Sequence, residues 1–545
     1  MRAVLHPRTT TPTSGPVILP TEHSTCKRLY GQFFFSQKGR TGGGGPPVRR
    51  EIEMADVVVI GAGLGGLASG VRLLQRGHSV TLLEKEPRVG GYAVSFRRHQ
   101  FTFDLALHVV PAGGQGQEFA AMIETLELTE SVRFIRLREG FRVHLGDYHF
   151  QMPGDYDALL ESLSREFPAE KKGIQLFRKD LERYVTIYAR VFDHRVSSYR
   201  SIPPFIPKIP AFLQHSMLPT TTYLQRFFHD ERLMAILFQP AAFMGIPMRN
   251  FPTVNFMMMF SLLLKNGMYT IAGGGQRLTD SLQGRFLQLG GTLLTNTAAE
   301  RIIIERKKAV AVRISDGRQL PCDAIIGGNN LHDMVNNLIG KALFTERYCR
   351  NFDTLKPSIS VLALNLGLDC SPKELGIDCH IAMVFPDADI DGCFDKQTGR
   401  IEPLGFSITA HGNSDPEFIE QGGNTLSLIG GTAPEMWLAM DDVQYRRQRK
   451  KVNLELLAMA DKRYPGLQDH IMISDLATPR TMARYTGNPL GAIMGLNCTV
   501  GKHRNILKAA KMPVANVIMG SAWTNRLGGF MQSVKSGILA AERIQ

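Results

Sequence analysis

The stretch VVVIGAGLGG, Val57 to Gly66, decides how this chain folds. Four apolar residues that favour strands lead into a turn that carries Gly61, Gly63 and Gly66, and the helical pattern LASGVRLLQRG follows directly. In this spacing the first glycine permits a tight turn, the second lets the backbone approach a pyrophosphate, and the third lets helix and strand pack closely. The helix N-terminus then faces the phosphates. The turn is therefore predicted to bind a dinucleotide through Gly61, Gly63, Leu64, Gly65 and Gly66.

An acidic residue follows at the expected distance. The run His78–Glu84 (HSVTLLE) reads as a second strand, and it ends in an acid about 20 residues beyond the turn, where a carboxylate accepts hydrogen bonds from ribose hydroxyls. Strand, turn, helix, strand and acid occur in order, which a chance glycine-rich core turn would not supply. We expect Glu84 and Lys85 to contact the cofactor.

A glycine pair after the acid separates two classes of cofactor. Gly90 and Gly91 follow Glu84 within a few residues, whereas an ordinary nicotinamide dehydrogenase would continue with further helix–strand units. The stretch resembles the E-x-x-x-x-x-G-G extension of the two-dinucleotide-fold flavoproteins. This resemblance favours FAD, with Gly90 and Gly91 near the flavin end.

Two distant segments complete the predicted site. Residues 269–330 read as a glycine turn, an amphipathic helix and strand-like runs, and they resemble the block that brings a short strand alongside the adenine in such flavoproteins. Ala299 stands where valine is usual, and because that contact is made by the backbone the change is expected to matter little.

The last segment, 516–544, reads as a strand that ends at Gly520 and a helix that begins after Gly528–Gly529. The helix N-terminus offers NH groups and a positive dipole end to the electron-rich edge of a flavin. Such flavoproteins commonly carry Asp or Glu where Ser521 stands, so one ribityl or phosphate contact is expected to be lost or altered. The cofactor contacts expected here are Gly520, Ser521, Gly529, Phe530 and Met531.

The predicted fold class is α/β: a two-dinucleotide-binding, Rossmann-like FAD domain with an inserted α+β substrate domain. The FAD domain is expected to be discontinuous, with residues 54–114, 269–330 and 476–545. The substrate-binding domain takes residues 115–268 and 331–475. Residues 1–53 are expected to be a basic, disordered leader, because their composition does not build a core.

Composition limits the classes of partner. The formal net charge of +13 is typical of proteins that meet nucleic acid or an anionic membrane, but an excess of Lys and Arg is also often a solvated face. No motif that reads DNA or RNA is visible, so no nucleic-acid partner is predicted. The seven cysteines are scattered without a C-x-x-C pair, which indicates a reducing compartment and no metal site. No apolar run approaches the roughly 18 residues of a spanning helix.

The first 50 residues leave the location open. They hold eight Lys and Arg against one acid, Glu22, and resemble an organelle transit peptide, which would indicate a mitochondrion or plastid. Met54 begins the run MADVVVIG and reads equally well as the true start. In that case the protein is expected in the cytoplasm or peripherally on a membrane.

With these segments the chain resembles the phytoene desaturase-like superfamily of FAD-dependent oxidoreductases, from about Met54 to its end. FTFDLALHVV, Phe101 to Val110, looks like the F-D-x-G-x-H stretch of retinol saturases and carotenoid isomerases, with Ala106 in place of the usual glycine. TPRTMARY, Thr478 to Tyr485, resembles their T-P-x-T-x-x-R-[FY] segment near the flavin. The resemblance implies saturation, desaturation or isomerisation at C–C and C=C bonds of a hydrophobic isoprenoid or polyene.

A flavin exchanges hydride with carbon, so the chain need not supply a nucleophile, but a proton must still be taken or delivered. The candidates near the expected flavin face are His108, Arg484 and Tyr485, and His108 is the predicted catalytic residue. A hydrogen-bonded structural histidine is the alternative. The electron donor or acceptor is left open.

The middle of the chain holds three segments dense in Phe, Met, Leu and Pro: 202–213, 233–248 and 255–268. A greasy tunnel or a membrane-docking surface is favoured for them over plain core. The net charge beside them would suit peripheral attachment to anionic lipid.

Two other functions stay open. An amine or other heteroatom oxidase shares the expected fold, but amine oxidases usually carry arginine where Tyr92 follows the glycine pair. The chain has only Trp437 and Trp523 to build an aromatic cage around a cation. The second alternative is a non-catalytic partner protein that FAD stabilises.

Overall fold

The computed structural model describes residues 54–187, 217–525 and 527–545, and these belong to one compact unit. The leader predicted for residues 1–53 and the apolar segment 202–213 lie outside the described residues. Among the helices of the described part, none is long and apolar enough to cross a membrane.

A five-stranded parallel sheet holds the glycine turn. Its strand order is β10-β2-β1-β14-β20, with bounds Thr292–Leu294, Ser79–Leu83, Asp56–Ile60, Ala324–Gly327 and Val517–Met519. Alternate residues of β1 point to opposite faces: Val57 and Val59 join one buried cluster, and Val58 and Ile60 join another. A sheet that is buried on both faces explains why β1 reads as a continuous apolar run.

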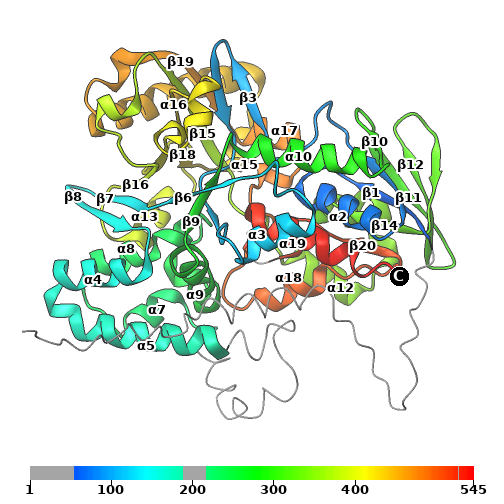
Figure 1. Ribbon diagram of the computed structural model, residues 1–545, viewed down its shortest axis with the longest axis horizontal. Coiled ribbons are helices and arrows are strands. Elements are labelled where there is room, and N and C mark those ends of the chain that lie inside the picture. The colour runs from blue at the N-terminus through cyan, green and yellow to red at the C-terminus, as the bar shows by residue number, and fades with distance from the viewer. Residues whose placement is uncertain (1–53, 188–216, 526) are drawn as a thin grey trace, which may run out of the picture. The chain divides into compact units, whose positions relative to one another are not determined.

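Helices cover both faces of this sheet. One face carries α2 (Leu64–Gln75), α10 (Gly275–Gln288) and α19 (Gly529–Ala541). The helices α2 and α19 lie side by side, although they come from opposite ends of the described chain (Figure 1). The other face packs against η7 (Met334–Ile339), α12 (Glu346–Asp353), α18 (His503–Ala509) and the β11-β12-β13 sheet (Ala299–Glu305, Lys308–Ile314, Gln319–Pro321). The predicted Rossmann-like α/β class is confirmed.

A seven-stranded sheet forms the second large element. Its order is β19-β15-β18-β17-β16-β7-β8, with bounds Ile471–Ala477, Val361–Leu368, Thr425–Gly431, Phe406–Thr409, Ile381–Phe385, Glu139–Leu145 and Tyr148–Pro153. All neighbours pair antiparallel except β16 and β7. Leu364, Leu428 and Leu476 on one face pack against the long helix α16 (Asp442–Arg463).

Smaller elements connect the two sheets. The strand pair β3-β4 is Ser95–Arg98 and Phe101–Asp104, and the sheet β5-β9-β6 is Val110–Pro111, Met268–Ile271 and Phe134–Leu137. The other helices include α3 (Glu118–Thr125), α4 (Tyr156–Glu166), α5 (Lys171–Ile187), α7 (Thr220–Leu224), α8 (Glu231–Ala242), α9 (Thr253–Phe260), α11 (Leu331–Asp333), α13 (Ile390–Gln397), α14 (Pro416–Glu420), α15 (Pro434–Ala439) and α17 (Pro479–Thr486).

The apolar segments 233–248 and 255–268 were expected to line a tunnel or dock on a membrane, and this expectation is wrong for most of their length. Most of their large apolar side chains are buried in one cluster with α4, α5 and the β7-β8 hairpin, and Phe243, Met258 and Met259 pack against it partly buried. Only Ala242, Phe243 and Gly245 from these segments line a pocket. A helix that is apolar all round, as α8 and α9 nearly are, buries every face in core.

The strands of the five-stranded sheet all come from segments 54–114, 269–330 and 476–545. Those of the seven-stranded sheet come from 115–268 and 331–475, apart from the last two residues of β19. The division into two domains stays a prediction.

Candidate cofactor and substrate site

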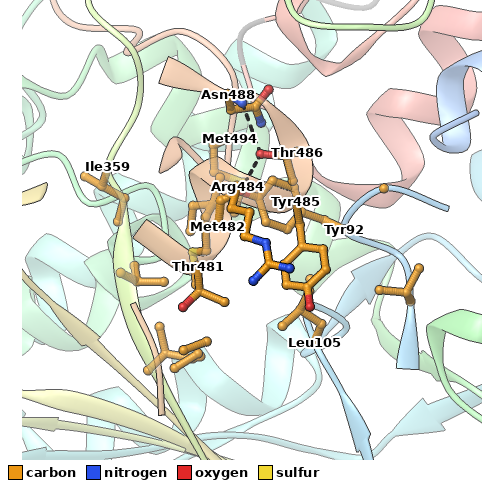
Figure 2. Close-up of a pocket in the computed structure, with 18 of the residues that line it drawn as sticks. Tyr92, Leu105, Ile359, Thr481, Met482, Arg484, Tyr485, Thr486, Asn488 and Met494 are labelled. Atoms are coloured by element: carbon orange, nitrogen blue, oxygen red, sulfur yellow. Dashed lines mark hydrogen bonds between the residues drawn. The ribbon is translucent and has the colours of Figure 1, made fainter. Parts of the chain in front are cut away.

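A cavity of about 1750 Å³ opens at the carboxyl ends of the parallel strands and extends over the seven-stranded sheet. Ligands of open α/β sheets bind at this edge, where strand order changes direction. Pockets for a single small ligand are usually about 300–1,000 Å³, so this cavity has room for a cofactor and a substrate together. Figure 2 shows part of its lining, including Tyr92, Met482 and Tyr485.

The glycine turn is built as the sequence predicts. Gly61 has φ +93°, a backbone conformation that residues other than glycine rarely adopt. A Cβ on Gly66 would lie 1.9 Å from the carbonyl oxygen of Gly61, so only glycine lets α2 pack this close to β1. A Cβ on Gly63 would meet nothing within 4 Å, because this position faces the open cavity. Gly63 is also the N-cap of α2 and no side chain caps the helix, which leaves its first NH groups for a ligand.

Glu84 follows β2 directly and is buried beside the turn. Its carboxylate accepts hydrogen bonds from the backbone NH of Ala62 at 2.9 Å and of Glu86 at 3.0 Å. Burial raises the pKa of Glu84, and these two backbone bonds oppose that rise. The neighbouring Lys85 donates through Nζ to the backbone oxygen of Arg484 at 3.4 Å, which connects the ribose edge of the cavity to α17.

The N-terminus of α19 meets the same cavity from another wall. Gly528 is its N-cap, no side chain caps it, and its first turn holds no acid. A Cβ on Gly529 would again enter open space. The hydroxyl of Ser521 accepts from the backbone NH of Trp523 at 3.4 Å, a local cap and not the acid usual at this position. Two uncapped helix ends, two open glycine positions and one buried acid fit a dinucleotide that carries a flavin.

The structure brings most predicted site residues together. The cavity is lined by Gly61, Gly63, Leu64, Gly65, Glu84, Lys85, Gly90, Gly91, His108, Ala299, Ser521, Gly529 and Phe530. Gly66, Gly520 and Met531 do not line it: they are buried where helix packs on sheet, and Met531 is 2% exposed. A direct contact of each residue with FAD stays a prediction.

The floor of the cavity beyond the glycine turn is one face of the seven-stranded sheet. A single row of paired residues crosses it: Ala477, Ala363, Ile429, Ser407 and Met383. At about 4.8 Å between neighbouring strands, the four steps of this row span about 19 Å. The end at β16 is closed by the apolar side chains of Phe243, Phe385 and Phe394.

His108 stands beside this floor in a group of three histidines. Its Nδ1 lies 2.8 Å from the hydroxyl oxygen of Thr409, and its backbone oxygen accepts from Nε2 of His380 at 2.8 Å. The rings of His380 and His411 lie 5.4 Å apart. Removal from water, together with His380, lowers the pKa of His108 to about 4, so the imidazole is neutral at pH 7.

Sequence reasoning missed the wall that α16 contributes. Its lining residues recur at helical spacing: Asp442, Tyr445, Arg446, Arg449, Lys450, Asn453 and Leu454. The signal was present, since positions 442, 446, 450 and 454 share a face of any helix, but the face is polar and reads as solvated surface.

One group of potential metal ligands exists among the described residues. Asp369, Cys370 and His470 place ligand atoms within 4.8 Å of one another, away from the cavity. His470 and Asp369 already form an ion-pair geometry at 2.9 Å. The expectation of no metal stays a prediction.

Comparison with known proteins decides the family. The model of the family described as flavin containing amine oxidoreductase matches residues 64–545. The chain belongs to this family. It is an FAD-dependent oxidoreductase, as the glycine turn, the acid and the glycine pair predict.

The relatives support the branch that the motifs indicate. The chain is 22% identical over 463 residues to prolycopene isomerase 1, chloroplastic, of an Oncidium hybrid cultivar, a match that covers 81% of this chain and 75% of the relative. It is 21% identical to the all-trans-retinol 13,14-reductase of Danio rerio, covering 86% and 82%. The resemblance to the phytoene desaturase-like superfamily, near carotenoid isomerases and retinol saturases, is confirmed.

A solved structure of putrescine oxidase with putrescine bound superposes with a TM-score of 0.62 at 14% identity, covering 90% of this chain and 98% of that one. At this identity the likeness establishes the fold alone.

Proposed function

We propose that this enzyme oxidises, reduces or isomerises C–C and C=C bonds of a hydrophobic isoprenoid or polyene. The observation that carries the proposal is the cavity itself, which continues from the predicted flavin end across a sheet face to an apolar end lined by Phe243, Phe385 and Phe394. Such a surface matches a long apolar chain better than a small polar substrate. The relatives named as a prolycopene isomerase and a retinol reductase support the same class.

The electrostatics of the cavity oppose an amine substrate. Its lining includes eight Lys and Arg side chains and five carboxylates, which disfavours a cationic ligand. Trp437 lies in the core of the second sheet, where its indole NH donates to Thr432 at 2.7 Å. Only Trp523 of the two tryptophans lines the cavity, so an aromatic cage for a cation is poorly supplied.

Different residues of the chain are proposed to have separate roles in the reaction. When bound, FAD supplies hydride transfer at carbon. The glycine turn and Glu84 would hold its adenosine half, and the sheet face would orient the substrate and keep water out. His108, held by Thr409 through one ring nitrogen, is positioned to accept or return a proton through the other.

A peripheral contact with a membrane would give the enzyme access to a substrate that is dissolved in the lipid. Val443 and Leu454 are exposed large apolar side chains on α16, where Leu454 lines the cavity, and both lie among basic residues of this helix. We expect flotation with vesicles that contain anionic lipid and none with neutral vesicles. Equal flotation with anionic and neutral vesicles would contradict the proposed contact with an anionic membrane.

The test of the reaction is anaerobic mixing of the FAD-loaded protein with a polyene, followed by separation and mass spectrometry of the products. Bleaching of oxidised flavin with loss of two hydrogens indicates desaturation, reoxidation of dithionite-reduced flavin with gain of two hydrogens indicates saturation, and a geometric isomer of unchanged mass indicates isomerisation. A protein whose flavin responds to amines, with release of hydrogen peroxide in air, and to no polyene would overturn the proposal.

A further inference from the structure

The wall of the cavity opposite its apolar end is basic and comes from one face of a helix. Arg446, Arg449 and Lys450 of α16 line the cavity, and Arg484 of α17 joins them. Figure 2 shows the guanidinium of Arg484 extending beside the ring of Tyr485, and it lies 5.3 Å from the centre of that ring. The cavity therefore has one charged end and one apolar end.

Some of these cations are already neutralised within the protein. Arg449 pairs with Asp475 at 2.9 Å, and Arg98 binds the other oxygen of the same carboxylate at 3.0 Å. Arg480 pairs with Asp442 at 2.6 Å.

Of the other lining cations, Arg88 donates to the backbone oxygen of Ser95 at 3.4 Å. The three that belong to α16 and α17 stay without a carboxylate. Within the described part of the chain, no acid lies within 4.0 Å of Arg446, Lys450 or Arg484. A cluster of unneutralised cations beside a low-dielectric cavity attracts an anion more strongly than isolated surface charges do.

The distance between the two ends suits one molecule. The row from Ala477 to Met383 spans about 19 Å across the sheet. Ala477 belongs to β19, beside Asp475, and so lies at the charged end, while Met383 lies at the apolar end. A ligand along this row would place an end group among the cations and its chain over Ala363 and Ile429.

We propose that the substrate is an isoprenoid or polyene chain with an anionic end group, a carboxylate or a phosphate, and that Arg446, Lys450 and Arg484 bind this group. The inference rests on the proposed function and names the substrate class of the same site. A neutral hydrocarbon leaves the three cations without a partner and gains nothing from this end of the cavity.

The test is titration of the FAD-loaded protein with matched ligands, read from the perturbation of the flavin spectrum and from KM. Retinoic acid is compared with retinol, and geranylgeranyl diphosphate with geranylgeraniol, so that only the end group changes within each pair. We expect the anionic member of one pair to bind about tenfold more tightly, the preference that one or two partly exposed charge-assisted hydrogen bonds supply. The pair that shows the larger preference identifies the end group.

Substitutions test whether the basic residues of α16 and α17 cause the preference for the anionic ligand. Arg446→Gln combined with Lys450→Gln is expected to remove most of it and to leave FAD content unchanged. The matched control is Arg447→Gln, which changes the neighbouring exposed arginine that does not line the cavity and should leave the preference intact. For Arg484→Gln, FAD content is measured as well, because Lys85 binds its backbone oxygen.

Three outcomes overturn the inference and remain distinguishable. If the acid and the alcohol bind equally tightly and the enzyme still turns over a polyene, the proposed function holds but the substrate has no anionic end group that the protein recognises. Loss of binding to anionic vesicles in the double variant, with ligand preference unchanged, assigns these cations to lipid instead. No response of the flavin to any polyene, charged or neutral, refutes the proposed function and the inference with it.

Discussion

Single positions of the glycine turn separate folding from binding. A Cβ at Gly66 collides with backbone, whereas a Cβ at Gly63 enters the cavity and touches nothing. The backbone of Gly63 has φ −71°, which any residue adopts. The same short motif therefore contains one glycine that the fold requires and one that only the predicted cofactor contact would require.

Gly63→Val is expected to fold normally and to lose most FAD binding, because its side chain fills the space that the pyrophosphate would take. The measurement is the flavin-to-protein absorbance ratio, with the free energy of unfolding from urea denaturation. Gly284→Val is the control, since a Cβ at Gly284 of α10 also meets open space but lies outside the cavity. A yellow, fully loaded Gly63→Val protein would refute the site.

Glu84→Ala is expected to lower FAD content as well, because it removes the predicted ribose contact and leaves the NH of Ala62 without its acceptor. Glu84→Gln keeps an acceptor oxygen and should retain more cofactor. Equilibrium dialysis with FAD compares the two, and equal affinities of wild type and Glu84→Ala would exclude this acid from the site.

His108→Asn tests the catalytic assignment. If His108 moves a proton, the variant should retain FAD and lose about 100-fold or more in kcat. Its pKa of about 4 means that the wild-type imidazole stays neutral above about pH 5, so this group imposes no pH dependence on kcat between pH 6 and 8. Unchanged kcat in the variant would leave His108 with a structural role only.

At the scale of elements, the three histidines connect the loop after β4, the residue that precedes β16 and the turn after β17. Removal from water lowers the pKa of His108 and His380 to about 4 and that of His411 well below its usual value. In the unfolded chain these groups titrate near 6.5, so the unfolded state binds more protons at every pH between about 4 and 6.5. Their contribution to stability is fully present above pH 6.5 and is lost as the pH falls through this window.

We therefore expect the free energy of unfolding to drop between pH 7 and pH 5, with a limit of about 3 kcal/mol each for His108 and His380 at lower pH. His380→Asn should flatten the dependence, even if it lowers stability at pH 7. Denaturant titrations at several pH values measure this, and a flat profile in the wild type would contradict the assigned pKa directions.

The crossing of α2 and α19 depends on small residues. A Cβ at Gly537 would lie 2.1 Å from the carbonyl oxygen of Gly65, which is backbone and cannot turn aside. Gly537→Ala is expected to destabilise the protein by about 1–3 kcal/mol and to weaken FAD binding, because α19 must move away from the cavity. Ala540→Gly, one turn along α19, lacks this clash and should keep FAD affinity; equal FAD affinity in Gly537→Ala would contradict the coupling.

The sequence could predict only those elements that have a local sequence pattern. The strand and acid around Val57–Gly66 and Glu84 were predictable because the glycine spacing is a local requirement of phosphate binding. The tunnel expected from segments 233–248 and 255–268 was wrong for most of their length, because side-chain composition does not distinguish a cavity wall from a filled core. Arg446 and Lys450 were missed, since only tertiary packing shows that their face of α16 meets a cavity.

The whole unit depends on contacts between distant segments, and the cavity predicted to hold the cofactor is lined by several of them. FAD is expected to stabilise the protein by about 2.7 kcal/mol at a free concentration 100-fold above Kd. The measurement is the thermal unfolding midpoint at increasing FAD, with riboflavin as the control that lacks the adenosine half. An equal shift with riboflavin would show that the glycine turn and Glu84 contribute nothing.

The sheet pairs β1, made early in translation, with β14 and, through it, β20, which is made near the end. The glycine turn that is predicted to bind the phosphates is made early, but α19, which forms another wall of the same cavity, is among the last described segments of the chain. A nascent polypeptide on the ribosome therefore holds half a flavin pocket through most of its elongation. We expect vitamin B2 starvation to leave finished but empty chains for proteolysis, and to leave translation itself undisturbed.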